Sequence, residues 1–268
     1  MRRGKCPKGL MPAGSTPTSG SGSSIKDYEV RMKAILFDLD GSLLPMDQDG
    51  FVGYYFKLLG EMMAGLGYDP KASVKAVIAG TKAMAENDGS RTNEDVFWEV
   101  FGNLLGEGVR AYEPLFDRFY RTEFEKTKAF SSPSQLAGEI LREARGKGYR
   151  TALATNPIFP RVATMARLRW AGLAEDEFEL ISTYEDFRFS KPNPGYYRQV
   201  MDNMSLLPED CLMAGNDIGD DAVALDLGMD FFLITDCLIN RGEKSIDSFK
   251  KGSLQDFSHF VKNLPIVG

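Results

Sequence analysis

The sequence predicts an α/β fold, a doubly wound parallel sheet of the Rossmann-like kind with an inserted all-helical domain. From residue 130 to the end, short apolar strands alternate with single helices, which is typical of a parallel sheet with helices on both faces. One apolar strand, at 33–37, is separated from this alternation by a block with only helical periodicity. We therefore expect an α/β core from 31–44 and 130–268, and a helical insert at 45–129.

A local sequence feature predicts each element of the N-terminal half. The apolar run Lys33–Phe37 ends at Asp38-Leu39-Asp40-Gly41, as a buried strand stopped by a turn does. In 51–66, apolar residues recur at steps of three and four, which is the period of a helix. N-cap residues and prolines mark the helices that follow. The predicted helices of this half are 51–66, one starting at Asp69-Pro70, one capped by Asn93, 112–128 and one starting at Ser132-Pro133.

The C-terminal half alternates between apolar runs typical of strands and stretches with the period of a helix. Its apolar runs are four to six residues long, and single stretches of helical periodicity separate them. Such runs are typical of strands buried on both faces of a parallel sheet. The predicted strands are 149–154, 178–183, 211–214 and 230–235, and the predicted helices are 160–171, 194–204, 219–227 and 253–263.

Composition excludes several classes of protein. Of the 268 residues, 43% are hydrophobic and 26% charged, which are globular values. No apolar run approaches the roughly 20 residues of a membrane span. Three cysteines in a chain of this length exclude a disulfide scaffold and favour a cytoplasmic protein. Residues 14–24 contain only Gly, Ser, Thr and Pro, so we expect 1–30 to be a flexible tail.

Charge is distributed unevenly along the chain. The net charge is −6, and residues 1–31 carry +4, so residues 32–268 carry −10. An acidic body repels a nucleic-acid backbone, which argues against nucleic acid as a partner. A small phosphorylated ligand remains compatible with this charge, because a metal ion or a few local cations can hold one.

Acidic residues follow two of the predicted strands. Asp38 and Asp40 come directly after 33–37, and Asp217, Asp220 and Asp221 come after 211–214. Carboxylates in an apolar context are costly unless a positive charge neutralises them, and Mg²⁺ prefers oxygen ligands. Aspartate and glycine are also common in turns. Two clusters at matched strand ends nevertheless favour a magnesium site.

Two further strand ends carry complementary groups. Thr155-Asn156 follows the strand at 149–154 and supplies a hydroxyl and the start of a helix, whose free amides can bind an anion. Lys191 lies just before the helix at 194–204. A lone lysine is usually solvated. A carboxylate nucleophile, a second carboxylate, a hydroxyl, an ammonium group and a metal site together suit phosphoryl transfer through an aspartyl-phosphate.

These motifs resemble those of the haloacid dehalogenase (HAD) superfamily. The family's D-x-D-x-T/V motif corresponds to Asp38-Leu39-Asp40-Gly41-Ser42, and its Ser/Thr motif corresponds to Thr155 in LATNP. Its lysine corresponds to Lys191-Pro192, and its acidic motif to Asp217 and Asp221 in GNDIGDD. The motifs occur in the family's order, and the insert at 45–129 resembles the helical cap of the subfamily that includes phosphoglycolate phosphatase and β-phosphoglucomutase.

The resemblance implies a role for each of these residues. Asp38 attacks phosphorus, and Asp40 protonates the leaving alcohol and then activates water. Asp38, the backbone carbonyl of Asp40 and Asp217 hold Mg²⁺, with Asp221 in support. Because Asn216 shifts the acidic pair by one position, Asp220 competes with Asp221 for that supporting role. The groups that hold the phosphoryl oxygens are Thr155, Lys191 and the amides of Leu39 and Asn156.

The implied function is that of a Mg²⁺-dependent phosphatase acting on a small phosphorylated metabolite. A phosphomutase using the same aspartyl-phosphate, and a non-catalytic phospho-accepting or binding protein, are the alternatives. The polar loop 87–93 of the cap offers Arg91 and Asn93 as substrate contacts. Their ordinary interpretations are a solvated side chain for Arg91 and a helix cap for Asn93. The sequence does not determine the oligomeric state.

Overall fold

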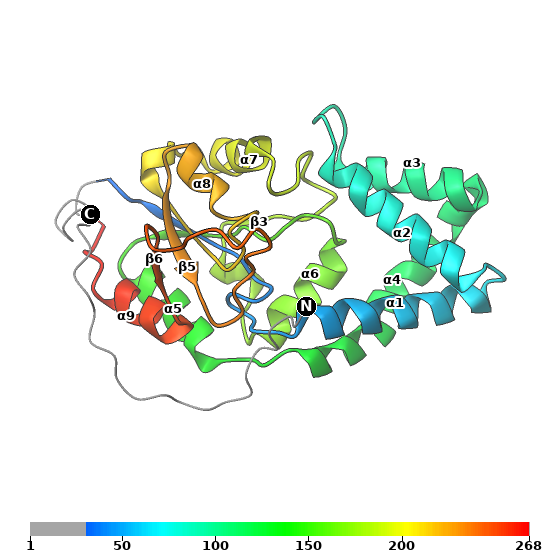
Figure 1. Ribbon diagram of the computed structural model, residues 1–268, viewed down its shortest axis with the longest axis horizontal. Helices are drawn as coiled ribbons and strands as arrows, with labels where there is room; N and C mark the ends of the chain where they lie inside the picture. The colour runs from blue at the N-terminus through cyan, green and yellow to red at the C-terminus, as the bar shows by residue number, and fades with distance from the viewer. Residues whose placement is uncertain (1–30, 268) are drawn as a thin grey trace.

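The computed structural model describes residues 31–267. An α/β core and a helical lobe lie side by side, with the lobe extending from one end of the core (Figure 1). The tail predicted at 1–30 lies outside the described residues, and the domain boundaries at 44–45 and 129–130 stay predictions. Within the described part, no helix has the length and apolarity needed to cross a membrane.

The core is built on a six-stranded sheet in the order β3-β2-β1-β4-β5-β6, and every paired neighbour is parallel. This arrangement confirms the predicted doubly wound parallel sheet, and β1 lies in its centre. The strands are β1 Ala34–Phe37, β2 Arg150–Leu153, β3 Leu180–Ile181, β4 Cys211–Gly215, β5 Asp230–Ile234 and β6 Lys250–Gly252.

Helices cover both faces of this sheet (Figure 1). Every residue of β1 is buried, with Ile35 and Phe37 in one apolar cluster and Ala34 and Leu36 in the other. Alternate side chains of a strand point to opposite faces, so β1 contributes to the cores on both sides. The first cluster includes α5 Gln135–Gly146, α6 Arg161–Trp170 and α9 Leu254–Lys262, and the second includes α7 Pro194–Met204 and α8 Val223–Asp226.

Every regular element in the described residues between β1 and α5 is a helix, which confirms the predicted all-helical cap. Its core is largely aromatic; Tyr55, for example, contacts the rings of Phe119, Tyr120 and Phe124. The helical segments are α1 Gln48–Gly65, α2 Pro70–Ala85, α3 Asn93–Leu105, η2 Glu107–Tyr112, α4 Glu113–Arg121 and η3 Glu123–Phe130.

Two predicted helices of the cap differ from the structure. The single helix expected at 112–128 is interrupted at Thr122, which has φ −125° and ψ −76° and whose hydroxyl donates to the carbonyl oxygen of Arg118 at 2.9 Å. Such a local side-chain bond competes with helix continuation. The expected Asn93 cap is wrong by one residue, because Thr92 Oγ1 accepts the amide of Asp95 and Asn93 is already helical.

Two elements of the core also differ. The helix expected at 219–227 is only Val223–Asp226, because the amides of Gly219 and Asp220 donate to the Asp217 carboxylate instead of starting the helix. The sequence analysis missed β6, a three-residue KKG strand at the sheet edge with no fully buried residue. Its Lys-Lys-Gly sequence lacks the apolar pattern of the other strands.

Candidate active site

The sequence-predicted side chains meet at the carboxyl edge of the sheet. Parallel register places Phe37, the last residue of β1, beside Leu153 of β2 and Ala214 of β4. The residues that follow these strand ends therefore lie close together, at the edge where open α/β sheets bind ligands. The principal cavity there has a volume of about 210 Å³, and its polar lining includes Asp38, Asp40, Thr155, Asn156, Lys191, Asp217, Asp220 and Asp221.

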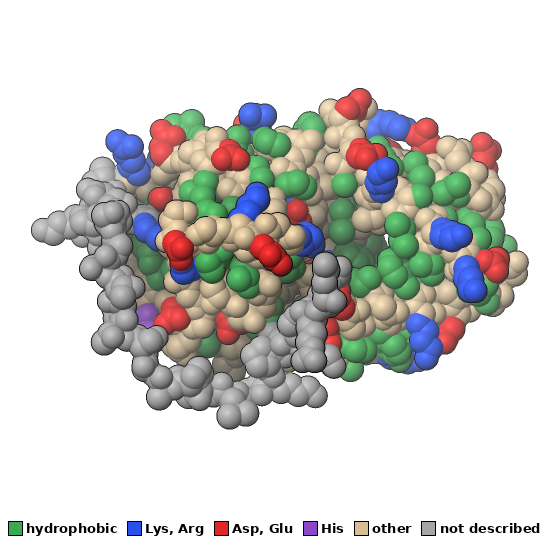
Figure 2. Space-filling view, viewed as in Figure 1, with side chains coloured by type: hydrophobic (Ala, Val, Ile, Leu, Met, Phe, Trp, Pro, Cys, Tyr) green, Lys and Arg blue, Asp and Glu red, His purple; other side chains and the backbone are tan. Residues whose placement is uncertain are grey.

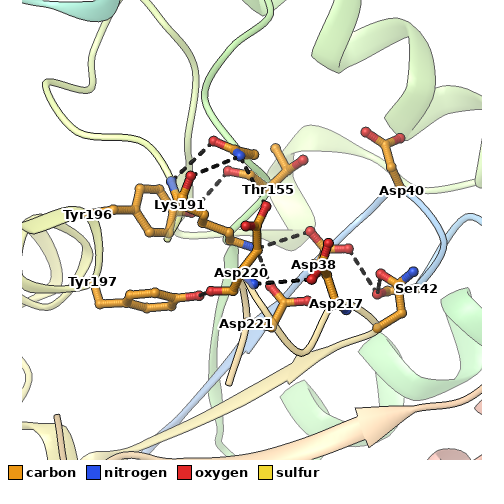
Figure 3. Close-up of polar contacts among 12 residues, drawn as sticks. Asp38, Asp40, Ser42, Thr155, Lys191, Tyr196, Tyr197, Asp217, Asp220 and Asp221 are labelled. Atoms are coloured by element: carbon orange, nitrogen blue, oxygen red, sulfur yellow. Dashed lines mark hydrogen bonds and ion pairs between the residues drawn. The ribbon is translucent and has the colours of Figure 1, made fainter. Parts of the chain in front are cut away.

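Asp38 lines this cavity and lies among the polar side chains of the site (Figure 3). Its side chain is 11% exposed. Lys191 Nζ lies 3.1 Å from Asp38 Oδ1, and Ser42 Oγ donates to Asp38 Oδ2 at 2.9 Å. Gly41, with φ +90°, makes the turn that brings Ser42 back to Asp38, and a Cβ there would lie 2.3 Å from Asn216 Nδ2. A carboxylate bound from both sides is oriented before any ligand arrives.

Lys191 connects two carboxylates in the interior. Its Nζ lies 2.6 Å from Asp221 Oδ1, and the Lys191 and Asp221 side chains are each 1% exposed. Burial alone would lower the pKa of Lys191, but Asp221 and Asp38 outweigh burial and raise that pKa well above its usual value. Burial likewise raises the pKa of Asp221, against the opposing effect of Lys191. The lysine therefore stays protonated and compensates the acids around it.

In the structure, Asp221 and Asp220 have different hydrogen-bond partners. Both oxygens of Asp221 are engaged, one by Lys191 and the other by the backbone amide of Asp217 at 3.0 Å. The Asp220 carboxylate instead lies 3.4 Å from Asn156 Nδ2. Burial, followed by the neighbouring charge of Asp217, raises the pKa of Asp220. Asp221 is thus the acid that supports Asp217 and Lys191, and Asp220 faces Asn156.

Backbone amides hold one oxygen of the Asp217 carboxylate. Its Oδ1 accepts the amides of Gly219 at 2.7 Å and Asp220 at 3.2 Å. Its Oδ2 pairs with Arg241 Nη1 at 2.9 Å, and the Arg241 side chain is 71% exposed. Because such an exposed side chain can leave with little loss of packing, Asp217 Oδ2 can be released for a ligand.

Asp40 stands apart from the other acids (Figure 3). Its Oδ2 forms an ion pair with Arg167 Nη1, while its Oδ1 is buried and has no hydrogen-bond partner among the described residues. Burial raises the pKa of Asp40, with Arg167 opposing that shift. A raised pKa favours a carboxyl group that can carry and donate a proton.

Arg167 is a site residue that the sequence analysis missed. Its side chain is 1% exposed, and the guanidinium lies 4.5 Å from the centre of the Phe159 ring. It also donates from Nε to the carbonyl oxygen of Ala163. The available signal was its spacing: Arg167 falls on the apolar stripe of α6 with Ala163 and Trp170, where a charge requires a partner.

The phosphate-binding candidates also lie at this cavity. Thr155 is buried and follows β2, and Asn156 Oδ1 accepts the backbone amide of Lys191 at 3.2 Å. This bond joins the loop after β2 to the loop that carries Lys191. Leu39 buries its side chain in the core, so a phosphate contact from it is restricted to the backbone.

The structure does not place Arg91 and Asn93 at this cavity. Asn93 is fully buried, and its Nδ2 donates to the carbonyl oxygen of Pro157 and to Ser190 Oγ, both at 3.1 Å. Arg91 forms an exposed ion pair with Glu99. Asn93 therefore ties the cap to the core, and the geometry gives their predicted substrate contacts no support.

The donor atoms at the edge suit Mg²⁺. Residues 31–267 contain no cluster of three or more His, Cys, Asp or Glu side chains arranged as metal ligands. Asp38 and Asp217 offer carboxylates, and the Asp40 carbonyl oxygen accepts a long 3.3 Å bond from Gln48 Nε2. Hard oxygen donors of this kind, completed by water, are the ligands that Mg²⁺ prefers.

The fold and the site together define an enzyme of the hydrolase class. The family model for haloacid dehalogenase-like hydrolases matches residues 32–228, and the chain belongs to that family. This result confirms the resemblance that the sequence motifs indicated.

Individual relatives agree with this assignment. The chain is 26% identical over 212 residues to a phosphoglycolate phosphatase of Nitrosospira multiformis, covering 77% of this chain and 85% of that protein. It is 23% identical over 188 residues to protein CbbY of Cereibacter sphaeroides, covering 66% and 73%. The fold is similar to that of a HAD phosphatase from Thermococcus onnurineus, with a TM-score of 0.56, 18% identity and coverage of 88% of this chain and 100% of that chain.

Proposed function

We propose that this protein is a Mg²⁺-dependent phosphatase that hydrolyses a small phosphorylated metabolite through an aspartyl-phosphate on Asp38. One observation carries the proposal: a buried carboxylate, Asp38, is oriented by Lys191 and Ser42 inside a cavity that Asp40 also lines. The family membership and the phosphoglycolate phosphatase among the relatives support it.

The chain's own residues account for both halves of the reaction. An oxygen of Asp38 forms a bond to phosphorus while the bond from phosphorus to the ester oxygen breaks, and Asp40 gives its proton to that oxygen. Asp40 then accepts a proton from water as the water oxygen attacks phosphorus, which breaks the Asp38–phosphorus bond and frees phosphate. The raised pKa of Asp40 suits the first step.

The remaining groups stabilise charge on the transferred group. Lys191 would hold one phosphoryl oxygen, and Thr155 with the amides of Leu39 and Asn156 would hold the others. Asp38, Asp217 and the Asp40 carbonyl would hold Mg²⁺, and Asp221 would keep Asp217 and Lys191 in place. When bound, Mg²⁺ would neutralise negative charge on the phosphoryl group.

Phosphate release from 4-nitrophenyl phosphate should depend on Mg²⁺. Removing the metal with EDTA is expected to lower the rate by about 10³-fold, because charge stabilisation by a metal contributes several kcal/mol to such reactions. The assay measures phosphate colorimetrically before EDTA, after EDTA and after addition of excess Mg²⁺, which should restore the rate. Full activity in EDTA would contradict the metal requirement.

Asp40→Asn should slow turnover by about 10²- to 10⁴-fold, the usual contribution of general acid–base catalysis. A leaving group of low pKa, such as 4-nitrophenol, needs little protonation. The variant should therefore lose more activity on an alkyl phosphate than on 4-nitrophenyl phosphate. Values of kcat/KM on both esters test this, because kcat/KM reports the step in which the leaving group departs, and an unchanged kcat/KM on the alkyl ester would rule out the acid role of Asp40.

A further inference from the structure

A second and larger cavity adjoins the acidic one. Its volume is about 1060 Å³, against about 210 Å³ for the cavity around Asp38. The two cavities share Val52, Ile158 and Phe159 in their linings, so they meet at these three residues. Figure 2 shows a hollow between the core and the helical lobe, with hydrophobic side chains along it. A ligand with its phosphate at Asp38 can therefore extend into the larger space.

Aromatic rings from both sides line this second cavity. The cap contributes Tyr55, Phe97, Trp98 and Phe116, and the core contributes Phe159 and Tyr184. The rings also contact each other across the two parts, as Phe97 and Tyr184 do at 6.3 Å and Tyr55 and Phe159 do at 5.5 Å. Aromatic walls favour a flat apolar group, which they can contact face to edge or in an offset stack.

The charges in the lining are unequally compensated. Each of its arginines has an acidic partner: Arg121 pairs with Asp117, Arg161 with Glu175 and Arg169 with Glu125. Two of its acids, Glu94 and Glu185, form no ion pair within residues 31–267. The arginines of the lining are therefore already paired with acids, whereas Glu94 and Glu185 form no ion pair among the described residues.

Glu185 has an unused acceptor. Its Oε1 accepts the backbone amide of Arg161 at 2.7 Å, whereas its Oε2 is buried and has no hydrogen-bond partner among the described residues. Burial raises the pKa of Glu94, and the charge of Glu185 raises it further, as expected of two carboxylates that face the same space. A buried acceptor without a partner is costly, and rotation of the Glu185 side chain toward the cavity that it lines would let a donor on a ligand satisfy it.

We infer that the second cavity receives the alcohol part of the substrate, and that this part is an aromatic or similarly flat apolar group carrying a protonated amine that pairs with Glu185 and Glu94. The inference rests on the proposed function for the phosphate end alone. It also disfavours phosphoglycolate as the substrate, because so small an anion would leave the aromatic cavity unfilled and would offer no cation to Glu94 and Glu185.

Two matched esters test the inference. The compounds 4-(2-aminoethyl)phenyl phosphate and 4-propylphenyl phosphate have nearly the same shape and differ in the charged amine. With Mg²⁺ present, we expect kcat/KM to favour the amine by about 10-fold, which corresponds to about 1.4 kcal/mol. Glu185→Gln should lower this ratio. Glu61→Gln, an exposed position on α1, is the matched control and should leave the ratio unchanged.

A binding measurement separates failure of the inference from failure of the proposed function. Calorimetry on the Mg²⁺-loaded protein compares tyramine with 4-propylphenol, the products of the two esters. Selective tyramine binding without hydrolysis of either ester would support the cavity chemistry and overturn the phosphatase proposal. Hydrolysis of both esters at equal rates, without selective binding, would overturn the inference and leave the phosphatase intact. Neither hydrolysis nor selective binding would overturn both.

Discussion

Replacing Asp38 by asparagine abolishes phosphate release in our account, with kcat lowered by about 10⁴-fold or more. The amide is a poor nucleophile, and no other group among the described residues is placed to substitute for it. The fold should persist, because an asparagine oxygen can still accept from Lys191 and its amide can donate to Ser42, so both contacts of Asp38 have counterparts. Rates on 4-nitrophenyl phosphate at saturating Mg²⁺ measure the effect.

The matched control is Asp202→Asn, which removes a carboxylate from an exposed position on α7. It should retain the activity of the unchanged protein. Circular dichroism of both variants establishes that neither loses structure. If Asp38→Asn kept even a tenth of the activity, Asp38 could not be the group that attacks phosphorus.

Lys191→Met should both destabilise the protein and inactivate it. The substitution removes the ammonium group that compensates Asp38 and Asp221, and leaves the buried Asp221 carboxyl group without its charge partner. Removing one partner of a buried ion pair typically costs about 3–5 kcal/mol. Urea unfolding in the absence of metal measures the loss of stability, and phosphate release with Mg²⁺ measures the loss of activity.

Two further variants make this result specific. Lys82→Met removes an exposed lysine of α2 that pairs with Glu86 at 3.6 Å, and a surface pair of that kind contributes about 0–1 kcal/mol. Combining Lys191→Met with Asp221→Leu removes the buried carboxyl group that has lost its partner, so stability should partly return while activity does not. Unfolding of Lys191→Met at the urea concentration of the unchanged protein would show that Lys191 does not compensate these carboxylates.

The polar residues that directly follow the apolar strands explain why the site could be predicted from the sequence. Asp38 and Asp217 each follow an apolar run, and parallel strands bring such positions to one edge regardless of the residues between them. The position of Lys191 alone did not predict a site residue, because a lysine just before a helix is also compatible with a solvated side chain. Its place in an ordered set of motifs identified it, and the structure buries it between two carboxylates.

Other features depend on contacts that no local pattern contains. Arg167 looks like one of several arginines in 161–170, and its ion pair with Asp40 joins residues 127 positions apart. Asparagine is a residue type that often caps helices, but the hydrogen bonds of Asn93 to Pro157 and Ser190 determine its role. The first residues of the helix expected at 219–227 are not helical, because the Asp217 carboxylate accepts the amides of Gly219 and Asp220.

The most direct test of the central claim is to locate the phosphoryl group on the protein. Asp40→Asn is mixed with 4-nitrophenyl phosphate and Mg²⁺, quenched in acid, digested and analysed by mass spectrometry. Our account predicts a phosphorylated peptide that contains Asp38, with the modification on that residue and none in a parallel Asp38→Asn/Asp40→Asn sample. A phosphoryl group on another residue, or release of 4-nitrophenol with no covalent adduct at any quench time, would contradict it.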